Sequence, residues 1–167
     1  MTSKKIFKPR ESTGWIWTAA IGLILLTAGL SSLVTAGFFS SFMLMILLTV
    51  PLGIAFLLIA VFFPTMRYEI DGTRLVLSYG PLLHYAIDIE RIRSIRRRDL
   101  KTSLVSSFRF PGLALFNVPY PEVGSVKMCA TAANTGILLI ETESTKYGLT
   151  PADEEKFVEE LRRRMKQ

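Results

Sequence analysis

The chain has 167 residues, half of them hydrophobic, and a formal net charge of +6. That length suffices for one domain together with membrane segments. The single cysteine, Cys129, and the single histidine, His84, exclude an intramolecular disulfide and a cysteine-based zinc site, and they leave little metal or nucleophile chemistry.

The hydrophobic residues are concentrated near the N-terminus. Residues 15–63 contain no Asp, Glu, Lys or Arg. Within them, residues 15–34 and 42–63 are apolar runs of about 20 residues. At about 1.5 Å per residue, each run reaches about 30 Å, the thickness of the hydrocarbon core of a bilayer. We therefore expect two transmembrane helices joined by a short uncharged linker. Because neither run contains an ionisable residue, the pattern argues against a transporter, a pump or an intramembrane protease.

Small residues predict how the two helices pack. Gly22 and Gly29 lie seven apart in the first run, on one face with Ala36, and Gly53 and Ala60 lie seven apart in the second. Small side chains let helix backbones approach closely. We interpret these stripes as the contact within the hairpin, with an oligomer interface as the alternative.

Flanking charges predict the orientation. Residues 1–14 form a basic N-terminal segment, and Arg67 and Arg74 follow the second helix. The positive-inside rule places both ends in the cytoplasm, as in a multi-pass protein of the cytoplasmic (inner) membrane. The alternative is a cleaved signal peptide, with Lys4 to Arg10 as its basic region and Val34-Thr35-Ala36 as its cleavage site; cleavage would leave one anchor and export the domain.

From Arg67 onward the pattern becomes that of β-strands. Apolar and polar residues alternate up to Asp71-Gly72, a strong hairpin signal, and Gly80-Pro81 marks a second turn. Ile89, Ile92 and Ile95 are spaced by three, which fits either a helical turn or a bulged strand. Short strands broken by Pro and Gly follow, and residues 136–141 are expected to form a buried strand.

The last element is predicted to be a helix. Thr150 is a suitable N-cap, Pro151 suits the first helical position, and Asp153 completes a variant of the capping box. The helix carries an apolar stripe, formed by Phe157, Leu161 and Met165. This stripe would pack on a sheet. Short strands followed by one amphipathic helix predict an α+β domain, a small split barrel with the helix closing one end.

Residues 67–165 resemble the bacterial pleckstrin-homology-like (PH-like) domains that are attached to a short membrane anchor. The matching pieces are Tyr68 to Gly72 with Leu75 to Leu77, Gly80-Pro81 with Ile87 to Ile92, Phe110 to Gly112, Gly124 to Ala130, and Tyr147 to Phe157. The resemblance implies that residues 67–167 form a PH-like split β-barrel of about seven strands capped by the C-terminal helix. It also implies a binding module without enzyme activity or cofactor.

One departure from the wider PH pattern bears on the ligand. Eukaryotic relatives that bind phosphoinositides place several basic residues around the first hairpin turn. Here that turn is Ile70-Asp71-Gly72-Thr73, with only Arg74 nearby. This departure argues against phosphoinositide recognition by that route.

The most basic stretch of the chain is residues 89–101. Its six cationic side chains, against the acids Glu90 and Asp99, are those of Arg91, Arg93, Arg96, Arg97, Arg98 and Lys101. Near an anionic leaflet each can contribute about 1 kcal/mol of binding free energy. We consider these six residues candidate contacts to anionic lipid. The alternative is a solvated basic segment with no ligand.

Aromatic residues between 108 and 120 form a second candidate surface. Phe108, Phe110, Phe116 and Tyr120 occur with several aliphatic residues, too many for one short edge strand to bury easily. They are candidates for docking on a partner membrane protein or for insertion into lipid. Core packing of a small barrel is the alternative.

No catalytic, cofactor-binding or metal-binding residues are identified. No spacing groups serine, histidine and acid into a triad, and no glycine-rich phosphate loop appears in the domain. The basic cluster lacks interleaved aromatic residues, so a nucleic-acid role is not expected. The sequence therefore favours a membrane-anchored, non-catalytic binding or scaffolding module that acts with a membrane protein partner or complex. The alternative is a sensor of anionic lipid through residues 89–101.

Overall fold

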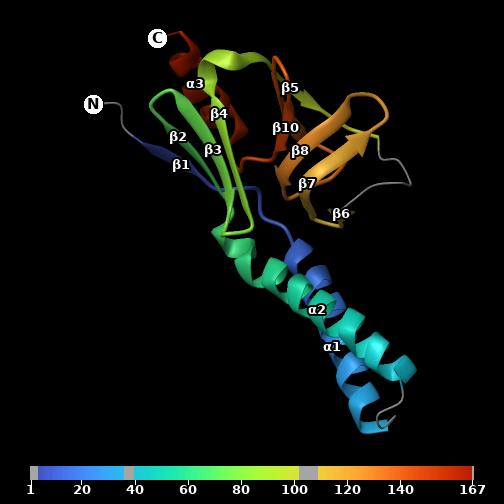
Figure 1. Ribbon diagram of the computed structural model, residues 1–167. Helices are drawn as coiled ribbons and strands as arrows, with labels where there is room; N and C mark the ends of the chain where they lie inside the picture. The colour runs from blue at the N-terminus through green and yellow to red at the C-terminus, as the bar shows by residue number, and fades with distance from the viewer. Residues whose placement is uncertain (1–3, 36–39, 102–108, 167) are drawn as a thin grey trace. The chain divides into compact units, whose positions relative to one another are not determined.

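The structure, a computed structural model, describes residues 4–35, 40–101 and 109–166. The chain divides into two compact units, Thr13–Pro64, which is helical, and a β-rich domain formed by Met1–Ser12 together with Thr65–Gln167 (Figure 1). The chain therefore begins in the β-rich domain, leaves it for the helices and returns. The helix pair is an insertion into the chain of one domain.

The helical unit contains α1, Gly14–Thr35, and α2, Ser40–Phe62, followed by one turn of 3-10 helix, η1, Phe63–Thr65. The bounds agree with the predicted helices to within one or two residues. By length and composition, both helices could cross a membrane. The predicted linker residue Ala36 lies outside the described residues.

The two helices meet through their glycines. A Cβ atom added at Gly22 would lie 2.9 Å from the carbonyl oxygen of Gly53, and one added at Gly29 would lie 2.7 Å from Oγ1 of Thr49. No side chain fits at such distances, so these positions permit the close approach of the backbones. The small-residue stripe thus lies at the contact within the hairpin, as predicted.

The first sheet of the β-rich domain is antiparallel, in the order β1-β2-β3-β4. Its strands are β1, Lys5–Phe7; β2, Arg67–Asp71; β3, Arg74–Tyr79; and β4, Leu83–Asp88. Gly72 and Gly80 have positive φ angles and form the two predicted turns, a conformation that glycine adopts without strain.

The second sheet has the order β5-β9-β10-β8-β7-β6, and only the β10–β8 pair is parallel. Its strands are β5, Ile92–Arg98; β6, Arg109–Phe110; β7, Leu113–Tyr120; β8, Gly124–Ala130; β9, Ile137–Thr142; and β10, Lys146–Leu149. The described residues form two separate sheets with ten strands, and the expected barrel of about seven strands is not closed. A turn of 3-10 helix, η2, Ile89–Arg91, separates β4 from β5, and β5 pairs with β9 instead.

The spacing of the isoleucines fitted either a helical turn or a bulged strand, and both interpretations are correct in part. Ile89 begins the helical turn η2, whereas Ile92 and Ile95 lie in β5. The pairing of β5 with β9 shifts register between Ile92 and Ser94, which is the predicted irregularity in the strand.

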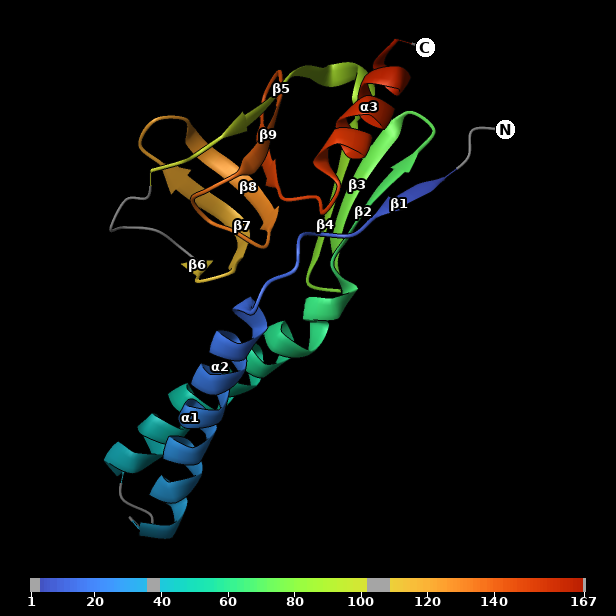
Figure 2. The ribbon, with the colours of Figure 1, turned by 180° about the vertical axis from the view of Figure 1, so that it is seen from behind.

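Strand β1 was not expected from the sequence. It pairs antiparallel with β2, Lys5 opposite Ile70 and Phe7 opposite Tyr68, and Figure 2 shows it beside β2 and α3. The chain then runs along the segment before α3, where the Arg10 amide donates to the Thr150 carbonyl at 2.7 Å. Part of the basic N-terminal segment is thus built into the domain.

Helix α3, Glu154–Met165, begins later than predicted. Its N-cap is Asp153, whose carboxylate accepts a hydrogen bond from the Lys156 amide at 3.1 Å, and the assignment of Thr150 as the N-cap is wrong. The Thr150 hydroxyl is buried and accepts a hydrogen bond from the Thr131 amide at 2.8 Å, next to the end of β8. It therefore does not cap the helix. In the predicted stripe, Phe157 and Leu161 are fully buried, whereas Met165 is exposed.

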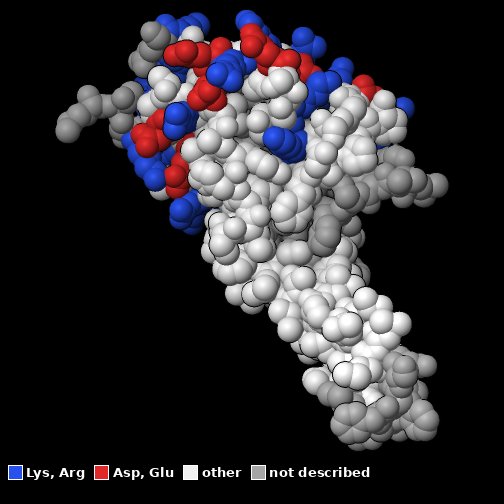
Figure 3. Space-filling model, in the orientation of Figure 1, with Lys and Arg blue, Asp and Glu red and all other residues white. Residues whose placement is uncertain are grey.

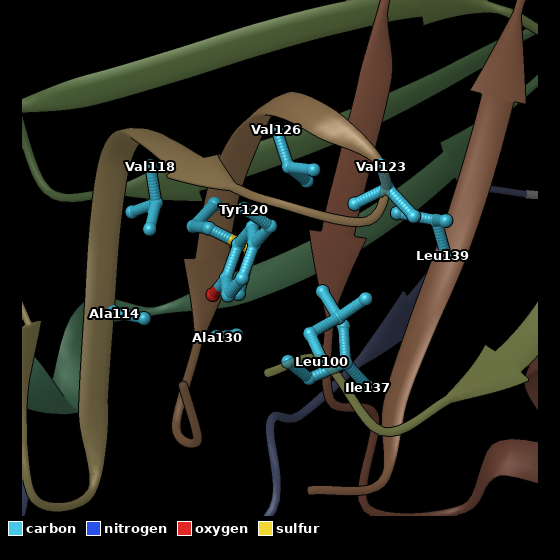
Figure 4. Packing of buried hydrophobic residues seen from close by; sticks show 10 residues of the cluster. Leu100, Ala114, Val118, Tyr120, Val123, Val126, Ala130, Ile137 and Leu139 are labelled. Carbon is cyan, nitrogen blue, oxygen red and sulfur yellow. The ribbon is translucent and has the colours of Figure 1, made fainter. Parts of the chain in front are cut away.

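Tyr68 of β2 and Phe157 of α3 are both fully buried where α3 packs on the domain. Their rings pack edge to face with centroids 6.1 Å apart, and the Tyr68 hydroxyl donates to the Cys129 carbonyl at 2.8 Å. Because successive side chains of a strand alternate in direction, Met128 and Ala130 face away from Cys129. They belong to a second apolar cluster on the other face of the six-stranded sheet. Figure 4 shows its buried members, Leu100, Ala114, Val118, Tyr120, Val123, Val126, Met128, Ala130, Ile137 and Leu139.

Candidate functional site

The basic segment 89–101 lies along an edge of the second sheet. β5 is the terminal strand and pairs only with β9 among the described strands. All six predicted cationic side chains are exposed. Figure 3 shows that basic and acidic side chains are intermixed over the visible face of the β-rich domain.

Four of the six cations have an acidic partner. Arg91 lies 3.4 Å from Asp88, Arg97 lies 3.8 Å from Glu154, Lys101 lies 3.7 Å from Glu122, and Arg93 pairs with Glu143. Exposed pairs of this kind contribute little stability, but each carboxylate offsets the charge that a ligand would meet. Among the described residues, no ion pair joins Arg96 or Arg98 to an acid, so these two carry the least compensated charge of the segment.

The strand divides the arginines between its two faces. Arg96 lies opposite Leu139 and Arg98 opposite Ile137, whereas Arg97 lies opposite Leu138. Side chains that are directly opposite in a sheet share a face. Arg96 and Arg98 therefore project from one face and Arg97 from the other, and the six residues do not form a single patch.

The charges of β5 also have a structural explanation. An edge strand presents unpaired backbone groups, and arginine or lysine side chains and bulges discourage pairing with another chain. β5 carries four arginines and a register shift near Ile92. A protected edge thus accounts for part of the basic composition without a ligand.

The aromatic candidates occupy different environments. Tyr120 is 2% exposed, lies in the second apolar cluster and donates its hydroxyl hydrogen to the Ala133 carbonyl at 2.6 Å. Phe110 and Phe116 are half-buried, in β6 and β7, and Phe108 lies outside the described residues. Phe110 and Phe116 are therefore partly accessible, whereas Tyr120 is not.

Phe116 has an unusual backbone conformation. Its φ angle is +63°, in the middle of a strand with regular pairing. A left-handed conformation is uncommon for a bulky residue and costs about 1–3 kcal/mol. Strained residues of this kind are found most often where they serve a function, which singles out Phe116 among the aromatic candidates.

The single histidine and the single cysteine lie in different strands and different environments. His84 is exposed on β4, and Cys129 is fully buried in β8. Burial raises the pKa of the Cys129 thiol to about 12, so it is almost entirely protonated at neutral pH and a poor nucleophile. Among the described residues, no group of three or more His, Cys, Asp or Glu side chains could hold a metal ion.

The fold also brings together residues that no local pattern connects. Arg10, from the segment after β1, and Arg97, from β5, both approach Glu154 at the start of α3. Arg10 was assigned only to the membrane flank. No spacing in the sequence indicates that it meets the basic strand.

Comparison with protein families agrees with this architecture of strands followed by a C-terminal helix. The model of the bacterial PH domain matches residues 66–165. The chain belongs to the bacterial PH domain family. PH-like domains are generally binding modules rather than enzymes. No curated protein and no solved structure gave a match.

The match to the bacterial PH domain also has defined bounds along the chain. It starts at Met66, directly before β2. Strand β1 and Arg10, which pack within the same compact unit, lie outside the matched range.

Proposed function

We propose that this protein is a membrane-anchored, non-catalytic PH-like module that binds or scaffolds a membrane protein partner. The observation that supports membrane anchoring is the apolar outer surface of the helix pair. Large apolar side chains 59–68% exposed cover it, among them Leu23, Ile24, Leu47, Leu48 and Val61. A soluble monomer rarely exposes a continuous apolar surface of this extent, whereas lipid solvates it without cost.

The chain path supports a topology with both termini on one side. β1 precedes α1, β2 follows α2, and the two strands are hydrogen-bonded neighbours in one sheet. A bilayer cannot separate paired strands, so a helix pair that spans it must begin and end on the same side. The basic residues flanking both helices favour the cytoplasm. Removal of the first helix as a signal peptide would also remove β1.

Reporter fusions test this topology. A fluorescent protein fused after Gln167 should fluoresce, and alkaline phosphatase inserted between Gly37 and Phe38 should be active, because the first folds in the cytoplasm and the second outside it. Both proteins should remain with the membrane after alkaline carbonate extraction. An active phosphatase at the C-terminus, or a chain released by carbonate, would contradict the proposal.

The half-buried aromatic residues are the proposed partner contact. A photo-crosslinking amino acid at Phe116 should give one discrete adduct with a membrane protein in intact cells. His84, exposed on β4 of the other sheet, is the matched control and should give none. Equal labelling from both positions would remove the proposed docking surface.

The second candidate function is contact with anionic lipid, favoured by the exposed Arg96 and Arg98. Both project from the same face of β5. A spin label introduced by Arg98→Cys, in a Cys129→Ser background, should become less accessible to a water-soluble relaxation agent when phosphatidylglycerol is added to phosphatidylcholine nanodiscs. An accessibility independent of lipid charge would eliminate this candidate.

A further inference from the structure

Two arginine side chains from distant parts of the chain meet above one glycine. A Cβ atom added at Gly136 would lie 3.0 Å from Nη1 of Arg10 and 3.3 Å from Nη2 of Arg97. Gly136 has a φ angle of +61° and no side chain, so the two guanidinium groups can pack directly over its backbone.

The backbone holds both arginines at this position. The Arg10 amide donates to the Thr150 carbonyl, which fixes the N-terminal segment beside the start of α3. Arg97 lies in β5 opposite Leu138, two residues beyond Gly136. Neither placement depends on the guanidinium groups themselves, which approach Glu154 at the start of α3.

The charges around the pair are incompletely balanced. The acid that approaches both arginines is Glu154, whose Oε2 lies 4.0 Å from Arg10 and 3.8 Å from Arg97, at the outer limit of an ion pair. The other nearby acid, Asp99, accepts a hydrogen bond from the Gly136 amide at 2.7 Å. Two converging guanidinium groups thus face one loosely held carboxylate, and their forked donors suit the oxygens of a phosphate group.

We propose that Arg10 and Arg97, which converge over Gly136, clamp a phosphate group that takes the place of the Glu154 carboxylate. The source that the chain favours is the headgroup of an anionic phospholipid, an assignment that rests on the proposed membrane anchor. Arg10 precedes the first residue of α1, Gly14, by four residues. Four extended residues reach at most about 14 Å, so a spanning α1 keeps Arg10 near the headgroups.

The test uses the full-length protein in neutral detergent micelles, with bound lipid measured by native mass spectrometry. The probes are dihexanoyl phosphatidylglycerol, dihexanoyl phosphatidylcholine and inorganic phosphate. We expect phosphatidylglycerol to bind in preference to phosphatidylcholine. Arg10→Gln and Arg97→Gln should each weaken its binding about tenfold, because each loses a charge-assisted hydrogen bond. Glu154→Gln should strengthen it, because the competing carboxylate is gone.

The matched control is Arg162→Gln, which removes the same charge from an exposed position of α3 outside both candidate lipid contacts. It should leave the affinity for phosphatidylglycerol unchanged. An equal loss in Arg162→Gln, or wild-type affinity in both Arg10→Gln and Arg97→Gln, would overturn the clamp. Thermal unfolding of each variant shows whether it is folded, and Arg10→Lys, which keeps the charge but loses the fork, should be intermediate.

Binding of inorganic phosphate distinguishes a lipid headgroup from soluble phosphate as the ligand. Displacement of phosphatidylglycerol by phosphate supports the clamp, and binding of phosphate without phosphatidylglycerol retains the clamp and assigns it to soluble phosphate. Carbonate extraction of the same variants reports on the anchor alone. Failure of the proposed anchor and failure of the clamp therefore give different results.

Discussion

Glu160 is the carboxylate on which the attachment of the N-terminal strand depends. It is 5% exposed, and its oxygens lie 2.8 Å from Lys5, 2.7 Å from Arg163 and 2.9 Å from Arg164. The hydrogen bond from Lys5, followed by those from Arg164 and Arg163, lowers the pKa of Glu160 from 4.5 to about 2. Lys5 belongs to β1, so this carboxylate joins the start of the chain to its last helix.

The lowered pKa of Glu160 predicts a dependence of stability on pH. Because the folded-state pKa lies below the unfolded value, the stabilisation is fully present above pH 4.5 and is lost as the pH falls toward 2. Denaturant unfolding between pH 6 and pH 3 should therefore show a steeper loss of stability in the wild type than in Glu160→Gln. Parallel curves for the two proteins would show that Glu160 does not contribute.

Strand β1 is only three residues long, and its Phe7 side chain adds an apolar contact with α3 to the Lys5–Glu160 ion pair. The Phe7 ring packs edge to face against Phe157, with centroids 5.2 Å apart, whereas Ile6 is 58% exposed. The remaining support comes from pairing with β2 and from the backbone hydrogen bonds around Pro9. The half-buried Phe7 ring is thus the apolar contribution of this short edge strand.

Substitutions on the two faces of β1 should therefore differ. Phe7→Asp should destabilise the domain by about 2–3 kcal/mol, because it removes an apolar contact and directs a charge at the core. Hydrogen exchange at the amides of β2 should accelerate with it. Ile6→Asp, in the same strand but facing solvent, should leave both quantities almost unchanged. Equal effects would show that the strand is held by its backbone alone.

The contact between α1 and α2 depends on glycine at its closest points. Gly29→Val should separate the helices, because a Cβ atom there already lies 2.7 Å from both Thr49 and Val50. Ala20→Val, at an exposed position of the same helix, is the control. The yield of a disulfide engineered across the hairpin should fall in the first variant and not in the second. Unchanged yield in Gly29→Val would contradict the observed contact.

The two ends of the helix pair enter one domain, which therefore has two covalent attachments to the helices. The family match covers residues 66–165, but the compact unit also includes the segment up to Ser12. The domain therefore contains residues from both sides of the helix pair.

A fragment of residues 66–167 should consequently be less stable than the complete domain. It lacks β1, Phe7 and the Lys5 partner of Glu160. A synthetic peptide of residues 1–12, added in excess, should raise its melting temperature, because the peptide binds only the folded fragment. The same peptide with Phe7→Ala should raise it much less. A melting temperature insensitive to either peptide would show that residues 4–12 do not complete the domain.

Local patterns in the sequence determined the two apolar helices, the turns at Asp71-Gly72 and Gly80-Pro81, and the C-terminal helix. These features follow from hydrophobic length, turn chemistry and helical periodicity, which act over a few neighbouring residues. The tertiary structure alone decided that β1 joins β2, that β5 pairs with β9, and that Thr150 serves the sheet while Asp153 caps the helix. It also brought Arg10 to Arg97. Each of these features depends on contacts between segments that are distant in the sequence. The free energy of such contacts is gained only when the whole domain packs, so adjacent residues give no sign of them.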